Sequence, residues 1–416
     1  MEGKLLVYNI GCLATPEGSA AKKGKEQAEI TLRKSCHILV ENGVIAEIGN
    51  NPQDIERKFK DGEKIDAGGC LVTPGLIDCH THFVFGGWRH GELGLKLAGA
   101  TYLEILAGGG GILNTVEKTR EASFDELFGK ACELLCECLS YGVTTIEAKS
   151  GYGLDVQNEV KCLEVIKKLN AECAVDFVPT FMGAHAVPKE HKESREKYIA
   201  LICDEMLPLV AEKCLACFCD VFCEKGAFTP EESRMILSKA KSLGMDLKIH
   251  AEEINNLGGA VLAAQLGCVS AEHLIMIDKA GIVALAGANT VAVCLPCTSF
   301  YLNEKFAPVR DMINAGVPVA VATDFNPGSS PNLNLQLAMN MACYKYKMQP
   351  AEILTAVTLN AAAAIGKAAQ AGTLEKGKWA DIVVWDAKEP DYIFYRYGSN
   401  LVKTVIKHGS IVKRNQ

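Results

Sequence analysis

Short apolar runs alternate with amphipathic helical patterns through the middle of the chain, from residue 71 to about residue 364. Most of the runs have the length and the β-branched content of a strand, and each is followed by a segment with helical spacing. This alternation is typical of βα units around a parallel sheet. We predict eight strands, over residues 70–77, 144–148, 177–181, 220–223, 247–249, 270–271 leading to His273, 291–295 and 317–322.

Eight βα units predict a closed (β/α)8 barrel of the TIM type, whose reactive groups gather at the carboxyl ends of the strands. A doubly wound open sheet is the alternative. Its strand ends would lie along a line that is too wide for their side chains to meet at one ion, so we favour the barrel.

Both ends of the chain have a different pattern. Residues 4–66 and 381–412 alternate in short β-like runs, which are broken by turns containing glycine and asparagine. We therefore predict a small β-sandwich that is built from both termini. The predicted division assigns residues 1–68 and 367–416 to the sandwich and residues 69–366 to the barrel.

The composition limits the partners and the location. A chain of 416 residues with 49% hydrophobic content can bury a large core, and a net charge of −7 without a basic run argues against nucleic acid or an anionic membrane surface as the main partner. No apolar stretch approaches the roughly 20 residues that span a bilayer. The strand-like start without a signal peptide predicts a cytoplasmic protein whose 18 cysteines are reduced.

Residues of the types that bind metal ions stand at the carboxyl ends of four predicted strands. His80 and His82 are two residues apart, so they project from the same face of a strand, with Asp78 as a supporting carboxylate. Alone, such a pair is more readily two hydrogen-bonded strand histidines. Three further strand ends favour one metal site, which suits zinc or iron and activates water for hydrolysis. The four segments are His80-Thr81-His82, Ile249-His250, Glu272-His273 and Thr323-Asp324.

Several neighbours of these residues are candidates for proton transfer. Glu253 follows His250 by three residues and suits a general base and proton shuttle. A carboxylate favoured by a helix N-terminus is an equal alternative. His273 is either a ligand or the group that orients the water. We expect one metal ion, because the fourth strand contains no lysine, and we expect Lys149 to make an ion pair with Glu147 or a surface contact.

Two further patterns have plainer interpretations. The glycine-rich segment 107–112 lacks both the pattern of a phosphate loop and a preceding strand, so we expect a flexible active-site loop. Cys214, Cys217, Cys219 and Cys223 include a C-x-x-C pair that suggests a zinc or redox site. The last two lie in a strand rich in Phe and Val, where a buried cysteine behaves as a small hydrophobic residue.

Several motifs together resemble the metal-dependent amidohydrolase superfamily and, in detail, its imidazolonepropionase family, over almost the whole chain. They are D-x-H-T-H at 78–82, I-H-A-E-E at 249–253, A-E-H-L at 271–274 and T-D-F-N-P-G-S-S at 323–330. The more specific segments are 85–89, 96–102, 108–112, 147–153 and 180–185. Cys79 and Glu252 depart from the family pattern, at positions not expected to contact metal or substrate.

The resemblance implies a role for each matching position. It makes His80, His82, His250 and Asp324 the metal ligands. It assigns water activation to Glu253 and His273, with Asp324 as a further catalytic residue. It implies that the substrate or the product is contacted by Arg89, Tyr102, Tyr152, His185, Glu253, Asn326, Gly328 and Ser329.

The resemblance also implies a reaction, which is hydrolysis of the ring C–N bond of 4-imidazolone-5-propanoate to N-formimidoyl-L-glutamate in histidine degradation. It implies a homodimer with one divalent or trivalent metal ion per subunit, zinc before iron. Arg89 would bind the carboxylate tail of this small-molecule substrate, and a structural salt bridge is the alternative for Arg89. Rival functions are another amidohydrolase reaction, such as purine or pyrimidine deamination, and a non-catalytic scaffold. Arg89 with Tyr152 favours the acidic-tailed substrate, and the intact ligand positions argue against a scaffold.

Overall fold

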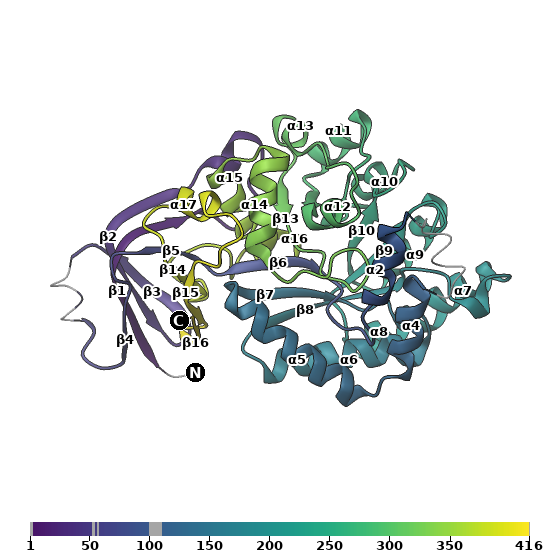
Figure 1. Ribbon diagram of the computed structural model, residues 1–416, viewed down its shortest axis with the longest axis horizontal. Helices are drawn as coiled ribbons and strands as arrows, with labels where there is room; N and C mark the ends of the chain where they lie inside the picture. The colour runs from purple at the N-terminus through teal and green to yellow at the C-terminus, as the bar shows by residue number, and fades with distance from the viewer. Residues whose placement is uncertain (1–2, 52–54, 56–57, 100–109, 416) are drawn as a thin grey trace.

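The computed structural model describes residues 3–51, 55, 58–99 and 110–415. A barrel and a smaller sheet lie side by side, and both ends of the described chain belong to the smaller sheet (Figure 1). This arrangement confirms the predicted (β/α)8 barrel with an attached β-structure from both termini.

The barrel consists of eight parallel strands in the order β13-β12-β11-β10-β9-β8-β7-β6. The strands read as nearly continuous apolar runs because both faces of each strand are covered. Their bounds are β6 Leu76–Thr81, β7 Val143–Lys149, β8 Asp176–Ala184, β9 Phe218–Cys223, β10 Asp246–Ala251, β11 Ser270–His273, β12 Val291–Cys294 and β13 Val319–Val321.

Backbone contacts join the first barrel strand to the segment that follows the last. The backbone N–H of Asp324 donates to the carbonyl of His80 (3.1 Å), and that of His82 donates to the carbonyl of Phe325 (2.8 Å). Thr81 and Phe325 form a parallel bridge between these contacts. These contacts close the barrel at the carboxyl ends of its strands, where the candidate ligands lie.

Helices surround the barrel (Figure 1), and capping residues in the sequence fix where several of them begin. α5 starts with a capping box between Ser123 and Glu126, and α9 starts with another, between Thr229 and Glu232. The helices are α2 Leu93–Leu97, α4 Ile112–Glu121, α5 Phe124–Ser140, α6 Val156–Glu172, α7 Arg195–Leu201, α8 Leu207–Glu212, α9 Pro230–Ser242, α10 Gly259–Leu266, α11 Lys279–Ala288, α12 Pro296–Tyr301, α13 Val309–Asn314, α14 Leu335–Tyr346, α15 Pro350–Ala356, α16 Leu359–Ala364 and α17 Pro390–Tyr395.

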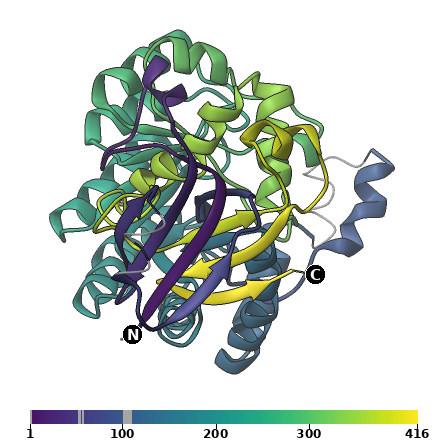
Figure 2. The same cartoon turned by 90° about the vertical axis from the view of Figure 1, so that its left-hand side faces the viewer.

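The smaller unit is one mixed sheet of eight strands, in the order β16-β15-β14-β5-β1-β2-β3, with β4 paired to β1. Its two halves meet at β5, which is parallel to β1 and antiparallel to β14. Figure 2 shows the purple N-terminal and yellow C-terminal strands next to each other. The bounds are β1 Lys4–Thr15, β2 Thr31–Glu41, β3 Val44–Gly49, β4 Glu63–Asp66, β5 Leu71–Pro74, β14 Ile382–Trp385, β15 Val402–Lys407 and β16 Ser410–Arg414.

The prediction of one strand over residues 70–77 is wrong, because this segment forms two strands in different sheets. β5 ends at Pro74 and belongs to the smaller sheet, whereas β6 begins at Leu76 and belongs to the barrel. Gly75 lies between them and packs closely on β7, since a Cβ there would lie 2.3 Å from Thr144 Oγ1. The chain therefore passes from one sheet to the other at Gly75.

An ionic cluster connects the two units at the end of the barrel opposite to the candidate ligands. Lys407, the last residue of β15, places its Nζ 2.6 Å from Asp176 Oδ2 and 2.6 Å from Asp381 Oδ2. His408 Nε2 lies 3.1 Å from the same Asp176 oxygen. Asp176 is the first residue of β8. We call Lys407, His408, Asp176 and Asp381 the Lys407 cluster.

The 18 cysteines are free thiols. Cys219 and Cys223 are fully buried in β9, in agreement with their interpretation as small hydrophobic residues. Among the described residues, no helix has the length and apolar content that crossing a membrane requires.

Candidate metal centre

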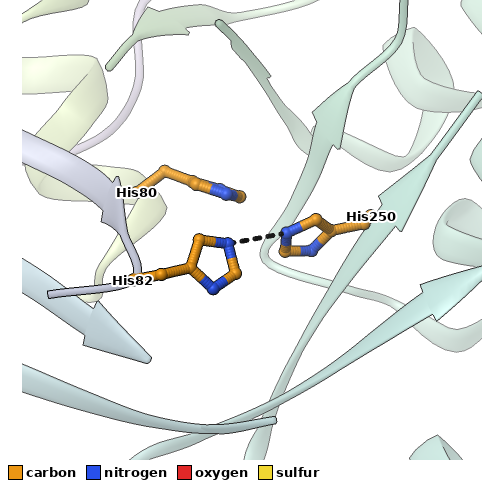
Figure 3. Close-up of side chains that lie close together, drawn as sticks. All are labelled: His80, His82 and His250. Carbon is orange, nitrogen blue, oxygen red and sulfur yellow. Dashed lines mark hydrogen bonds between the residues drawn. The ribbon is translucent and has the colours of Figure 1, made fainter. Parts of the chain in front are cut away.

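Three imidazoles converge at the carboxyl ends of barrel strands (Figure 3). His80 belongs to β6 and His82 follows two positions later, so both side chains point into the barrel. His250 comes from β10. The Nε2 atoms of His82 and His250 are 3.4 Å apart, and a ring nitrogen of each histidine lies within 4.8 Å of the other two. All three residues are buried.

Asp324 brings a carboxylate to the same place from the end of β13. Its Oδ1 lies 3.4 Å from Nε2 of His80 and 3.6 Å from Nε2 of His82. Asp324 Oδ1 and His80 Nε2 are buried without a hydrogen-bond partner among the described residues. Leaving such an atom without a partner costs about 1–3 kcal/mol, and an ion between the two would satisfy both. Three imidazoles and a carboxylate are a donor set that fits zinc or iron.

Carboxylates contact the outer ring nitrogens of two of these histidines. Glu272 Oε2 lies 2.7 Å from His80 Nδ1, and Asp220 Oδ1 lies 3.0 Å from His250 Nδ1. A proton on Nδ1 is directed to each carboxylate, so Nε2 of each ring is left to face the site. The carboxylates therefore orient the rings toward one centre.

Asp78 and Thr298 fix the surroundings of Asp324. Asp78 accepts hydrogen bonds from the backbone N–H (3.1 Å) and the hydroxyl (2.6 Å) of Thr323. Asp78, predicted as a supporting carboxylate, thus anchors the residue before Asp324. Thr298 donates its hydroxyl proton to Asp324 Oδ2 at 2.5 Å. Asp324 Oδ1 is thereby directed to the histidines.

Burial sets the charge of the candidate ligands. It lowers the pKa of His80 and His82 well below the ordinary value of 6.5, so both rings are neutral and can bind a metal ion. It also raises the pKa of Asp324 to about 7, although the hydrogen bond from Thr298 and the charge of His250 act in the opposite direction. A cation at this position would favour the ionised carboxylate.

Glu253 and His273 form a pair beside the ligands. Glu253 Oε2 lies 3.6 Å from His273 Nε2, and the two side chains are 13% and 3% exposed. Burial and the neighbouring carboxylates of Asp324 and Glu224 raise the pKa of Glu253 to about 8. A carboxyl group whose pKa lies near neutrality can both take up and release a proton in this environment.

The helix-terminus alternative for Glu253 is wrong. α10 begins at Gly259 and has no acidic residue in its first turn. Glu252 is the residue that serves this helix, since its carboxylate accepts a hydrogen bond from the backbone N–H of Ala260 (3.0 Å). Glu253 is thus left to face His273.

His273 also lies within reach of the candidate ligands. One ring nitrogen of His273, one of His80 and a carboxylate oxygen of Asp324 lie within 4.8 Å of one another. The geometry therefore keeps both interpretations of His273, as a ligand or as the group that orients the water.

Tyr152 and His185 line the same space from the ends of β7 and β8. The His185 ring stacks on the His82 ring at 4.8 Å, and the Tyr152 ring lies 5.8 Å from the His82 ring. His185 Nδ1 lies 3.0 Å from the carbonyl of Gly151, which fixes the orientation of the ring. Burial and the neighbouring His250 lower the pKa of His185 to about 3, so this ring is neutral.

Arg89 lies at the rim of the site and is already paired. Its Nε and Nη2 donate to the carboxylate of Glu92 at 3.0 to 3.1 Å. Its Nη1 faces Gly328, where a Cβ atom would lie 2.1 Å away. The structural salt bridge is therefore present. Arg89 nevertheless remains next to the loop of expected substrate contacts, since it packs against Gly328.

That loop is held by the side chain of Asn326. Its Oδ1 accepts hydrogen bonds from the backbone N–H groups of Gly328 (2.8 Å) and Ser329 (2.7 Å), and its Nδ2 donates to the carbonyl of Asp324 (2.7 Å). The loop that carries Asn326, Gly328 and Ser329 is thus tied directly to a candidate ligand. Tyr102 and residues 107–109 of the glycine-rich segment lie outside the described residues.

Lys149 and Asp220 are the parts of the site that the sequence did not assign. Lys149 is fully buried, so the predicted surface contact is wrong, while its predicted ion pair with Glu147 is present at 2.7 Å. A second ion pair joins Lys149 to Asp220 at 2.8 Å. The signal that could have found Asp220 is a lone acidic residue within the apolar strand 218–223.

Comparisons with known proteins agree with the fold. The sequence pattern of the Amidohydrolase family matches residues 71–412. The structure of an adenosine deaminase from Xanthomonas campestris with bound zinc superposes with a TM-score of 0.71 at 18% identity, covering 98% of this chain and 92% of that chain. At such low identity the likeness shows the fold alone.

Two relatives that are more similar in sequence share one name. An imidazolonepropionase from Alkaliphilus oremlandii is 50% identical over 411 residues, which cover 98% of this chain and 97% of that protein. One from Thermoanaerobacter pseudethanolicus is 48% identical over 407 residues, with the same two coverages. The chain belongs to the amidohydrolase family and, within it, to the imidazolonepropionases.

Proposed function

We propose that this chain hydrolyses the ring C–N bond of 4-imidazolone-5-propanoate and releases N-formimidoyl-L-glutamate. The observation that carries the proposal is the buried centre in which His80, His82 and His250 meet Asp324 at the ends of the barrel strands. The family of the chain indicates the substrate, because relatives with 48% and 50% sequence identity are imidazolonepropionases.

His80, His82, His250 and Asp324 would hold one metal ion, and we propose zinc first and iron second. The fit rests on neutral imidazoles and on two buried atoms, His80 Nε2 and Asp324 Oδ1, that find no hydrogen-bond partner in the described part of the chain. When bound, such an ion polarises a carbonyl group and makes hydroxide available near neutral pH.

Glu253 and His273 would activate the attacking water and transfer its proton. Glu253 takes up the proton of the attacking water and delivers it to the ring nitrogen that leaves when the C–N bond opens. His273, whose Nε2 lies 3.6 Å from Glu253 Oε2, would orient the water. Asp324 would act as the further catalytic residue through its place among the four residues that would hold the ion.

Arg89 would bind the carboxylate tail of the substrate. Glu92 fixes its guanidinium through Nε and Nη2, which leaves Nη1 at the loop of Asn326, Gly328 and Ser329. A guanidinium group gives a charge-assisted hydrogen bond to a carboxylate, and its pairing with Glu92 fixes it before the substrate arrives.

The imidazolone ring would lie against Tyr152 and His185. Both residues flank His82 at the mouth of the barrel. A neutral His185 with Nδ1 toward Gly151 offers its Nε2 as a hydrogen-bond acceptor to a ring N–H. Tyr102, Asn326, Gly328 and Ser329 complete the proposed set of substrate contacts.

The test measures turnover and metal content on the same sample. Freshly generated 4-imidazolone-5-propanoate is added, and the loss of its ultraviolet absorbance is followed before chelation, after chelation and after readdition of zinc or iron. Turnover that disappears with the metal and returns with it supports the proposal. If a metal-loaded sample shows no turnover, the proposed substrate is wrong. Adenine and cytosine are then added, and release of ammonia would support the deaminase alternative.

We further propose a cytoplasmic homodimer with one ion per subunit. The 18 free thiols suit a reducing compartment. Light scattering after size-exclusion chromatography tests the subunit number, and a mass of one chain contradicts it. We likewise propose the division of the chain near residues 68 and 366, with strand β5 (Leu71–Pro74) counted with the smaller sheet.

A further inference from the structure

We propose that Lys149 is a positioning residue for the metal centre, because its buried ammonium group ties the strand of His80 and His82 to the strand of His250. The inference rests on the proposed metal site and adds a residue to it. Lys149 itself is expected to touch neither the ion nor the substrate.

Lys149 lies between two carboxylates inside the barrel. Its Nζ is 2.7 Å from Glu147 Oε1 and 2.8 Å from Asp220 Oδ2, and all three side chains have no exposed surface. The ammonium group and the two carboxylates hold one another in place, because each carboxylate would otherwise be a buried charge without a charged partner.

The Asp220 side of this unit leads to His250. Asp220 uses Oδ2 for Lys149 and Oδ1 for Nδ1 of His250, at 3.0 Å. One carboxylate therefore spans the ammonium and the ring. A shift of Asp220 would turn the His250 ring and move its Nε2 away from the other ligands.

The Glu147 side leads to the other two histidines. Glu147 Oε2 accepts a hydrogen bond from the backbone N–H of Thr81 (3.3 Å), and the Glu147 carbonyl accepts one from the Thr81 hydroxyl (2.7 Å). Thr81 is the residue between His80 and His82. Lys149 thus links the two halves of the ligand set through one carboxylate on each side.

Stability alone does not account for this arrangement. A buried ion pair is weak evidence for stability, because the loss of hydration can exceed the attraction between the charges. Residues that orient metal ligands have a different effect, since replacing them typically weakens metal binding about 10- to 100-fold. Metal affinity is therefore the property that separates a positioning role from a purely structural one.

The experiment compares Lys149→Met with a matched control, Lys407→Met. Lys407 is also buried between two carboxylates, at 2.6 Å from each, but at the opposite end of the strands. Each purified full-length protein is stripped of metal, and its Zn²⁺ affinity is measured by competition with a chromophoric chelator. Thermal unfolding of the metal-free proteins gives the stability effect separately.

Lys149→Met is expected to weaken Zn²⁺ binding about 10- to 100-fold. Lys407→Met is expected to lower the stability of the metal-free protein and to keep the Zn²⁺ affinity within about twofold of wild type, because distant sites act independently. If Lys149→Met does not fold, Lys149→Gln keeps an amide donor for Asp220 and is judged by the same criterion.

Three outcomes separate the two proposals. Wild-type protein that binds no Zn²⁺ overturns the metal site itself. Wild-type protein that binds Zn²⁺, together with a Lys149 variant that binds equally well, overturns the positioning role alone. A loss of affinity of the same size in Lys407→Met also overturns it, because the effect would then follow general destabilisation.

Discussion

Glu253 Oε2 and His273 Nε2 lie 3.6 Å apart, and each belongs to a different strand end of the barrel. A carboxyl group with a pKa of about 8 and a neutral imidazole thus share one face of the metal centre. In the proposed function, this pair transfers protons while His80, His82, His250 and Asp324 hold the ion.

Replacing Glu253 by Gln keeps the shape of the side chain and removes its ability to carry a proton. We expect kcat to fall about 10²- to 10⁴-fold, the usual contribution of a general acid or base. The zinc content, measured by elemental analysis, should stay at the wild-type level. Activity within tenfold of wild type, or a loss of bound zinc, would contradict the shuttle role.

Arg89→Met should raise KM and leave kcat nearly unchanged. A charge-assisted hydrogen bond contributes about 1.5–3 kcal/mol, which corresponds to a rise in KM of roughly 10- to 100-fold. Steady-state kinetics measures both parameters.

Lys96→Met is the matched control for Arg89, because Lys96 also approaches Glu92 (3.8 Å) and donates to the Gly328 carbonyl (2.9 Å). An equal rise in KM in this control would show that order of the loop, and not the charge of Arg89, determines affinity. An unchanged KM in Arg89→Met would refute the carboxylate contact.

Gly75→Ala should destabilise the protein, because the new methyl group would lie 2.3 Å from Thr144 Oγ1. Overpacking of this kind costs about 1–3 kcal/mol, which urea unfolding can measure. Combining Gly75→Ala with Thr144→Ala should restore part of the loss. Gly129→Ala in α5 is the control, since nothing lies within 4 Å of a Cβ there, and it should be neutral or slightly stabilising.

Asp176→Asn should reduce stability at neutral pH by about 1–2 kcal/mol, because it weakens the partly exposed Lys407 cluster. Burial raises the pKa of Asp176, but the hydrogen bond with His408 and the charge of Lys407 outweigh burial and lower the pKa below 3.8. The ionised carboxylate therefore contributes stability above pH 3.8, and this contribution is lost as the pH falls through the lower pKa of the folded state.

Urea midpoints of wild type and Asp176→Asn should accordingly converge as the pH is lowered below 3.8. A constant difference between the two proteins from neutral to acidic pH would mean that the charge of Asp176 contributes nothing and that the substitution acts through packing alone.

Patterns that depend on neighbours in the sequence were predictable. The apolar runs predicted seven of the eight barrel strands close to their observed bounds, and the spacing of His80 and His82 placed both side chains on one face. The break at Gly75 was missed because an unbroken apolar run does not reveal that its two halves join different sheets.

Contacts that depend on the register between strands were not predictable. Asp220 meets His250, and Glu272 meets His80, only once the barrel has closed and brought their strand ends together. Arg89 has a local partner, Glu92, three residues later, but the turn between them follows no strong periodicity. The sequence therefore predicts which residues meet at the candidate site, but not which carboxylates contact the outer nitrogens of His80 and His250.

The closing seam of the barrel has a consequence for biosynthesis. Thr323 and Asp78 are joined by a hydrogen bond across 245 positions, so the ribosome makes the first ligands long before the last. Bringing such distant segments together costs entropy that only the finished barrel offsets. A nascent chain that stops before Asp324 carries the H-x-H pair without the fourth donor or the strand beside it. A site that needs all four donors is therefore complete only after Asp324 has been synthesised and the barrel has closed.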